Sequence, residues 1–121
     1  MTQKQGSFNF TITEERDVVV VAMEGYFTDT STEMIEKQLL PALMQGKIRI
    51  VIDFSRISLM NSPGIASLLE LLMKIREEFL GKSVLCGISP LLKEIFQMAG
   101  VTPMFLTAED KDDAMETAHM K

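Results

Sequence analysis

The chain has 121 residues, of which 46% are hydrophobic and 24% charged, a composition that excludes a wholly disordered chain and fits one globular domain. Its 12 basic residues are outnumbered by 17 acidic ones, and the net charge of −5 argues against direct binding to a nucleic acid. No apolar run approaches the roughly 20 residues that span a bilayer, and the start lacks the apolar stretch of a secretory signal, so we expect a cytoplasmic protein without membrane insertion.

A β-hairpin is predicted at the beginning of the chain. Apolar residues alternate with polar ones over residues 8–12, and the charged run 14–17 supplies a turn. The β-branched run 18–21 then forms the second strand. A loop is expected over residues 25–29.

The first helix is predicted to follow that loop. Thr30 has Glu33 three positions later, the spacing of a capping box, and apolar residues then recur at helical spacing over residues 34–43. Pro41 is expected to kink this helix or end it early, because proline lacks the N–H and clashes with the preceding turn.

The middle of the chain is predicted to form a buried strand and a long helix. Residues 48–54 are dense in β-branched side chains, and residues 56–61 are expected to loop out. The helix is expected over residues 63–80, with Gly81 in the C-terminal capping position. Ser62 is a preferred N-cap residue, and Pro63 suits the first helical position.

The last third repeats this pattern. Residues 82–88 form a strand, Ser89-Pro90 opens a helix in the same way, and Gly100 closes it. A short strand over residues 104–107 and an acidic helix over residues 109–118 complete the chain.

These elements predict one α/β domain over residues 1–121, with a core from about residue 7 to residue 118. The order β-β-α-β-α-β-α-β-α implies a mixed, mostly parallel sheet covered by about four helices. Such sheets carry their functional residues at the carboxyl ends of the strands. The loops at 25–30 and 56–62 are therefore the candidate site.

Enzyme chemistry finds little support in the sequence. The single histidine, His119, lies near the end of the chain and is expected to be solvated, so no nucleophile–histidine pair can be assembled. One cysteine and one histidine cannot supply a zinc site, and no glycine-rich phosphate loop follows any strand. Cys86 lies in an apolar run and is read as a buried, inert thiol. We expect no enzyme, no metal and no cofactor.

Asp53, at the end of a predicted strand, raises the alternative of a response-regulator receiver domain. That domain needs an acidic pair after its first strand and a lysine after its last, and neither is found here. Asp53 is instead expected to pair with a helix-start N–H or a basic neighbour, or simply to end the strand.

The segment from Ile50 to Ser55, followed by Leu59 to Ile65 and Leu68-Leu69, resembles the signature of the STAS family, the fold of the anti-sigma factor antagonists. In that family a buried strand ends in Asp-Leu-Ser or similar, and a segment like Asp-Ser-Ser-Gly-Leu opens the next helix. The likeness covers nearly the whole chain. It extends to Gly25, the strand at Ile48, the run from Val84 to Gly87, and the sequence Ala99-Gly100-Val101.

The resemblance implies a protein that binds an anti-sigma factor, often a serine kinase, in a partner-switching system that regulates transcription. By position, the serine that such a kinase phosphorylates is Ser62. Two residues depart from the family pattern: Asn61 stands where the switch proteins usually have Asp, and Pro63 where a second Ser or Thr is common. The local pattern alone favours an N-cap role for Ser62, as at Ser89-Pro90, and the resemblance adds phosphorylation as a second role that is compatible with it.

A partner surface is expected where the two candidate loops meet. Its predicted residues are Thr28, Asp29, Thr30, Asn61, Ser62, Pro63 and Gly64. Gly64 is expected to let a partner or a neighbouring backbone approach, so that Gly64→Ala would keep or slightly raise stability while impairing the complex. The alternative function is a STAS scaffold subunit of a stress-signalling or lipid-transport complex that is not phosphorylated. We expect a monomer or weak dimer.

Overall fold

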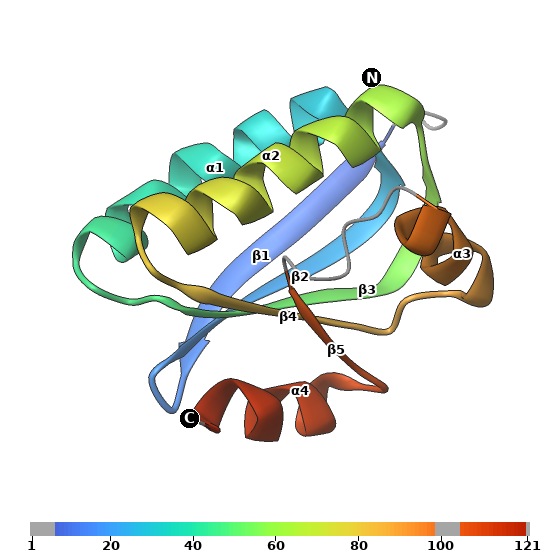
Figure 1. Cartoon of the computed structure of the whole chain (residues 1–121). Helices are drawn as coiled ribbons and strands as arrows, with labels where there is room; N and C mark the ends of the chain where they lie inside the picture. The colour runs from blue at the N-terminus through green and yellow to red at the C-terminus, as the bar shows by residue number, and fades with distance from the viewer. Residues whose placement is uncertain (1–6, 99–104, 121) are drawn as a thin grey trace.

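The computed structural model of the chain describes residues 7–98 and 105–120, and Figure 1 gives its layout. The order of helices and strands agrees with the order predicted from the sequence. The elements are β1 (Phe8–Glu15), β2 (Val18–Phe27), α1 (Asp29–Met44), β3 (Arg49–Met60), α2 (Ser62–Glu78), β4 (Lys82–Cys86), α3 (Pro90–Met98), β5 (Leu106–Ala108) and α4 (Lys111–His119).

The sheet has five strands in the order β1-β2-β3-β4-β5. Strand β1 is antiparallel to β2, and each later strand is parallel to its neighbour. Helices α1 and α2 lie side by side over one face of the sheet, and α4 lies against the other (Figure 1). The predicted mixed, mostly parallel sheet covered by helices is confirmed.

The run of four valines in β2 explains why both faces of the sheet are covered. Successive side chains of a strand point to opposite faces. Val19 and Val21 join the core under α1 and α2, whereas Val18 and Val20 join a smaller apolar cluster with residues of α4. A strand buried on both faces therefore needs an unbroken apolar run.

Strands β2 and β3 are longer than predicted, so the loops expected at 25–29 and 56–61 are largely strand. The ladder continues to the pair Phe27 and Met60 through two register shifts, which let the backbone stay paired past the apolar run. Gly25 has a φ of +101° at one of these shifts, a conformation that glycine adopts readily. As a result, both strands lead directly into helices.

The ends of the first two long helices also differ from the predictions. Pro41 lies inside α1, and the predicted early end is wrong. Pro41 is exposed and lies in the last turn of α1. Because proline has no N–H, the backbone carbonyl one turn earlier lacks its usual hydrogen-bond donor, but this carbonyl is not buried in the core. After α2, the left-handed residue is Leu80, with a φ of +54°, and not Gly81. Gly81 is required for space, because a Cβ there would lie 2.9 Å from the Ile48 carbonyl oxygen.

The predictions at Gly100 and over residues 99–104 lie outside the described residues. Within the described part of the chain, no helix is both long and apolar enough to cross a membrane.

Candidate functional site

The starts of α1 and α2 lie next to each other because β2 and β3 are parallel neighbours that end together. Phe27 and Met60 are the last paired residues of the two strands. The Asn61 N–H then donates a hydrogen bond of 3.1 Å to the Phe27 carbonyl oxygen, which joins the two strand ends. The structure therefore brings together the two candidate loops that the sequence predicted separately.

Asn61, and not Ser62, is the N-cap of α2. The Asn61 Oδ1 accepts a 2.7 Å hydrogen bond from the Gly64 N–H, and Ser62 is already the first residue of the helix. The predicted capping role of Ser62 is therefore wrong, because β3 continues to Met60 and the first non-helical residue before α2 is Asn61. At the other Ser-Pro pair the prediction holds, since Ser89 Oγ accepts a hydrogen bond from the Leu92 N–H.

The side chain of Ser62 is exposed and does not stabilise the start of α2. Its hydroxyl makes no hydrogen bond with any residue in the ranges 7–98 and 105–120. Pro63 beside it is also exposed. A hydroxyl that caps a helix is held against the backbone, whereas this one is available to another molecule.

Gly64 is buried and belongs to the packing beneath the surface. A Cβ at this position would lie 2.8 Å from the Phe27 carbonyl oxygen and 2.9 Å from the Thr28 Cα, both of them backbone atoms. The neighbouring backbone is thus what approaches Gly64. The expectation that Gly64→Ala would keep the stability unchanged is contradicted by this geometry.

Helix α1 begins one loop residue after β2. Thr28 is its N-cap, where Thr30 was predicted, and the Ser31 Oγ accepts a 2.9 Å hydrogen bond from the Thr28 N–H. Ser31 is buried, whereas Asp29 and Thr30 are exposed beside the start of α2. Asp29 is the acidic residue of the first turn, where a carboxylate interacts favourably with the helix dipole.

An acidic groove of about 430 Å³ lies between α1 and α2 and begins at Asp29. Its lining carries four carboxylates and one ammonium group, so its net charge is negative. These charged residues are Asp29, Glu33, Glu36, Glu70 and Lys74. Apart from Asp29 they were not predicted, although the spacings from Asp29 to Glu33 and from Glu70 to Lys74 are those of neighbours on one helix face.

Two polar contacts hold the walls of the acidic groove together. The Ser67 hydroxyl lies 2.7 Å from Thr32 Oγ1, and Lys74 Nζ lies 2.7 Å from Glu36 Oε2. The hydrogen bond with Glu36, followed by its charge, raises the pKa of Lys74. The spacing between the two helices is thereby defined at two levels along the groove.

Three other residues discussed from the sequence lie away from this surface. Asp53 lies inside β3 rather than at its end and accepts a 2.9 Å hydrogen bond from the Ser55 N–H. Within residues 7–98 and 105–120 it forms no ion pair and accepts no hydrogen bond from a helix start. Cys86 is buried, as predicted, and burial together with the charge of Asp53 raises the pKa of its thiol to about 12. His119 is not simply solvated, because its ring nitrogens lie 2.8 Å from the Met115 carbonyl oxygen and 2.6 Å from that of Arg16.

Comparison with known families agrees with this architecture. The family model described as the STAS domain matches residues 9–114. The chain belongs to the STAS domain family. The predicted family is therefore confirmed, and the match runs from β1 into α4.

Individual relatives in the STAS family are distant but cover most of the chain. BtrV of Bordetella bronchiseptica is 25% identical over 97 residues, which are 80% of this chain and 83% of BtrV. The anti-sigma F factor antagonist of Lysinibacillus sphaericus is 26% identical over 97 residues, or 79% of this chain and 82% of that protein. The Bacillus cell fate determinant SpoIIAA in its phosphorylated form is similar in structure, with a TM-score of 0.70 and 26% identity over 92% of this chain and 100% of SpoIIAA.

Proposed function

We propose that this STAS protein is an anti-sigma factor antagonist, which binds an anti-sigma factor in a bacterial partner-switching system. Support comes from the family and from a relative of similar length that is named as an antagonist of an anti-sigma factor. The binding surface in this proposal comprises the adjoining starts of α1 and α2. It consists of Thr28, Asp29, Thr30, Asn61, Ser62 and Pro63, with Gly64 beneath them.

Phosphorylation of Ser62 by the partner, acting as a serine kinase, would control this binding. The observation that carries the proposal is the cap of α2: because Asn61 satisfies the Gly64 N–H, the exposed Ser62 hydroxyl is not needed for folding. A kinase could therefore modify Ser62 without removing a structural contact. The similarity to a SpoIIAA structure in a phosphorylated form agrees with this proposal.

The effect of a phosphate at Ser62 follows from the groups around it. Phosphoserine carries about −1.5 to −2 charges at neutral pH, which the amino end of a helix tolerates. Pro63 has no N–H, and the Gly64 N–H is already bound to Asn61, so the phosphate would gain little from the first turn. The dianion would stay at the surface, where a partner shaped for a neutral hydroxyl would have to desolvate it.

The acidic groove suggests the chemistry of the partner. Its carboxylates extend the proposed surface along α1 and α2, so the matching surface of the anti-sigma factor would be basic. In this proposal the chain acts by binding alone, as a cytoplasmic monomer or weak dimer, and needs no cofactor.

Affinity purification from the source cell tests the proposal. Wild-type, Ser62→Ala and Ser62→Asp proteins would serve as baits, and retained proteins would be identified by mass spectrometry. We expect the first two to retain an anti-sigma factor, and Ser62→Asp to lose it. Incubation of that partner and ATP with the wild-type protein should add one phosphate to Ser62. Retention of the same partner by Ser62→Asp, with no phosphate on Ser62, would favour the alternative of an unphosphorylated scaffold.

A further inference from the structure

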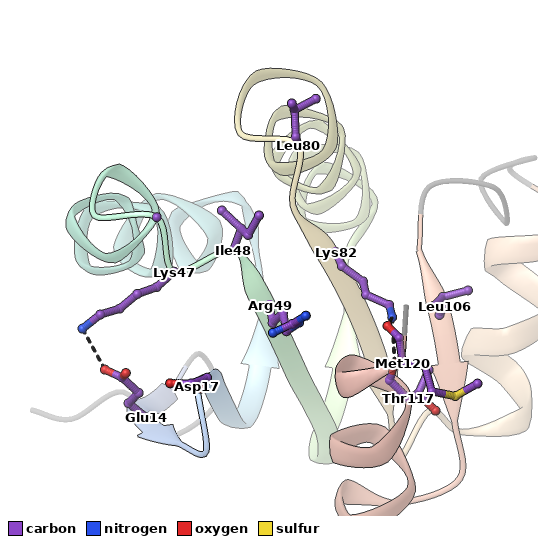
Figure 2. A pocket seen from close by; sticks show the side chains of 11 residues that line it. Glu14, Asp17, Lys47, Ile48, Arg49, Leu80, Lys82, Leu106, Thr117 and Met120 are labelled. Atoms are coloured by element: carbon purple, nitrogen blue, oxygen red, sulfur yellow. Dashed lines mark hydrogen bonds and ion pairs between the residues drawn. The ribbon is translucent and has the colours of Figure 1, made fainter.

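A second hollow lies at the other end of the sheet, where β3 and β4 begin (Figure 2). Its volume is about 980 Å³, which is within the range of sites for small molecules. The wall formed by α4 ends at Met120, and the opposite side is formed by the turn after β1 and the segment before β3. We call this hollow the strand-start pocket.

Two basic residues lie side by side on the floor of the strand-start pocket. Arg49 and Lys82 are direct neighbours in the register of β3 and β4, so both project from the same face of the sheet. Like charges directly opposite each other on adjacent strands are destabilising. Neither side chain has an ion-pair partner among the described residues.

Among the basic residues of the pocket, the positive charge of Arg49 has the fewest compensating interactions. Lys47, also in the pocket, is paired with Glu14 at 2.8 Å. The Lys82 ammonium donates two hydrogen bonds, to the Thr117 carbonyl oxygen at 2.8 Å and to the Met120 carbonyl oxygen at 2.5 Å.

Arg49 is a half-buried residue whose guanidinium lies in the middle of the pocket and makes no hydrogen bond or ion pair within the described part of the chain (Figure 2). Two carboxylates also line the pocket, Asp17 and the Glu14 that is paired with Lys47, so its three basic side chains exceed the acidic ones by one. The uncompensated guanidinium of Arg49 therefore favours an anionic ligand.

The rim of the strand-start pocket is apolar. Leu80, Leu106 and Met120 line it with exposed fractions of 80%, 45% and 63%. Leu80 is moreover held at a φ of +54°, in the left-handed region that a leucine rarely occupies. A strained backbone that keeps a large apolar side chain in solvent beside a pocket points to a ligand that covers this side chain.

We propose that the strand-start pocket binds an amphipathic anion, a carboxylate or phosphate that carries an aliphatic chain. The anionic group lies between Arg49 and Lys82 and relieves their mutual repulsion, and the chain covers Leu80, Leu106 and Met120. The pocket is separate from the proposed partner surface, because Arg49 is the first residue of β3 and Ser62 follows its end, so that the length of a 12-residue strand, at most about 40 Å, lies between them.

Titration of the full chain with decanoate and decyl phosphate, followed by amide NMR shifts and calorimetry, tests the proposal. Both anions should shift residues 47–49 and 80–82 saturably, and the tighter of the two identifies the head group. Inorganic phosphate and decanol, which lack the chain and the charge respectively, should each bind at least about tenfold more weakly. Equal binding of decanol, or shifts confined to other residues, would overturn the proposal.

Two variants and one control define the contribution of each part of the pocket. Arg49→Gln should weaken decanoate about tenfold or more, whereas Arg56→Gln, on the same strand but exposed outside the pocket, should bind like the wild type. Leu80→Gly should weaken decanoate while raising the melting temperature, because glycine relieves the left-handed conformation. Unchanged affinity in a folded Arg49→Gln protein would show that the pocket is not an anion site.

Discussion

Asn61 and Ser62 are adjacent residues with separate tasks, which makes the structural and regulatory roles of the start of α2 separable by mutation. Asn61→Ala should lower the free energy of unfolding by about 1 kcal/mol, because the Gly64 N–H loses its cap. Ser62→Ala should change it by less than about 0.5 kcal/mol, since the hydroxyl is exposed and makes no hydrogen bond with the described residues. Urea unfolding of both variants measures the difference. A larger loss for Ser62→Ala than for Asn61→Ala would assign the cap to Ser62.

Gly64 allows the starts of α1 and α2 to lie close together, because it has no side chain. Gly64→Ala should destabilise the protein by about 1–3 kcal/mol, because the new Cβ would meet the backbone at Phe27 and Thr28 at less than 3 Å. Ser62→Ala in the same helical turn is the control. Thermal and urea unfolding measure the effect, and a Gly64→Ala protein as stable as the wild type would mean that the loop moves away without cost.

Helices α1 and α2 act together as the walls of the acidic groove, so a charge at its mouth should affect partner binding. Asp29→Lys should weaken binding of the anti-sigma factor and leave the protein folded. Asp112→Lys is the matched control, because Asp112 is also an exposed acid in the first turn of a helix, α4, on the opposite face of the sheet. Both variants lose a similar favourable interaction with a helix dipole, about 0.3–1 kcal/mol.

Binding isotherms at two salt concentrations make this comparison. The difference between Asp29→Lys and the wild type should shrink as salt rises, because exposed charges are screened. Equal affinities for Asp29→Lys and Asp112→Lys would move the interface away from the start of α1.

At the scale of elements, local sequence predicted the order of helices and strands but not where they meet. The dipeptides at Ser62 and Ser89 are identical, yet only Ser89 caps its helix. The cause is tertiary: pairing with β2 keeps β3 extended to Met60, which moves the helix start by one residue. The acidic groove could be partly predicted from the spacing of charged residues along α1 and α2. The position of Arg49 beside Lys82 could not be predicted, because it depends on the register between β3 and β4.

The whole molecule is built around a sheet that is covered on both faces. The reactivity of the buried Cys86 thiol can therefore measure how often this structure unfolds. Burial raises the pKa of this thiol to about 12, so the thiolate is scarce at pH 8 in the folded protein. Cys86 should therefore react with Ellman's reagent only when the molecule unfolds, at a rate that follows global stability in urea. Fast reaction of the native protein would indicate local opening of β4 or α4.

The same pKa gives the direction of a pH effect on stability. A thiol whose folded pKa lies above its ordinary 9.0 favours the folded state fully at lower pH. Its contribution should be lost as the pH rises from about 9 towards 12. Cys86→Ala should lack this component of the alkaline loss of stability, which urea unfolding at several pH values would measure.

In the proposed function, a phosphate on Ser62 switches partner binding without unfolding the domain. Isothermal titration of the captured anti-sigma factor with the unmodified protein, and with protein that carries phosphoserine at position 62, tests it most directly. We predict the same melting temperature within a few degrees and an affinity at least about a hundredfold weaker for the phosphorylated form, which corresponds to a few kcal/mol of desolvation. Equal affinities of the two folded forms would contradict the claim.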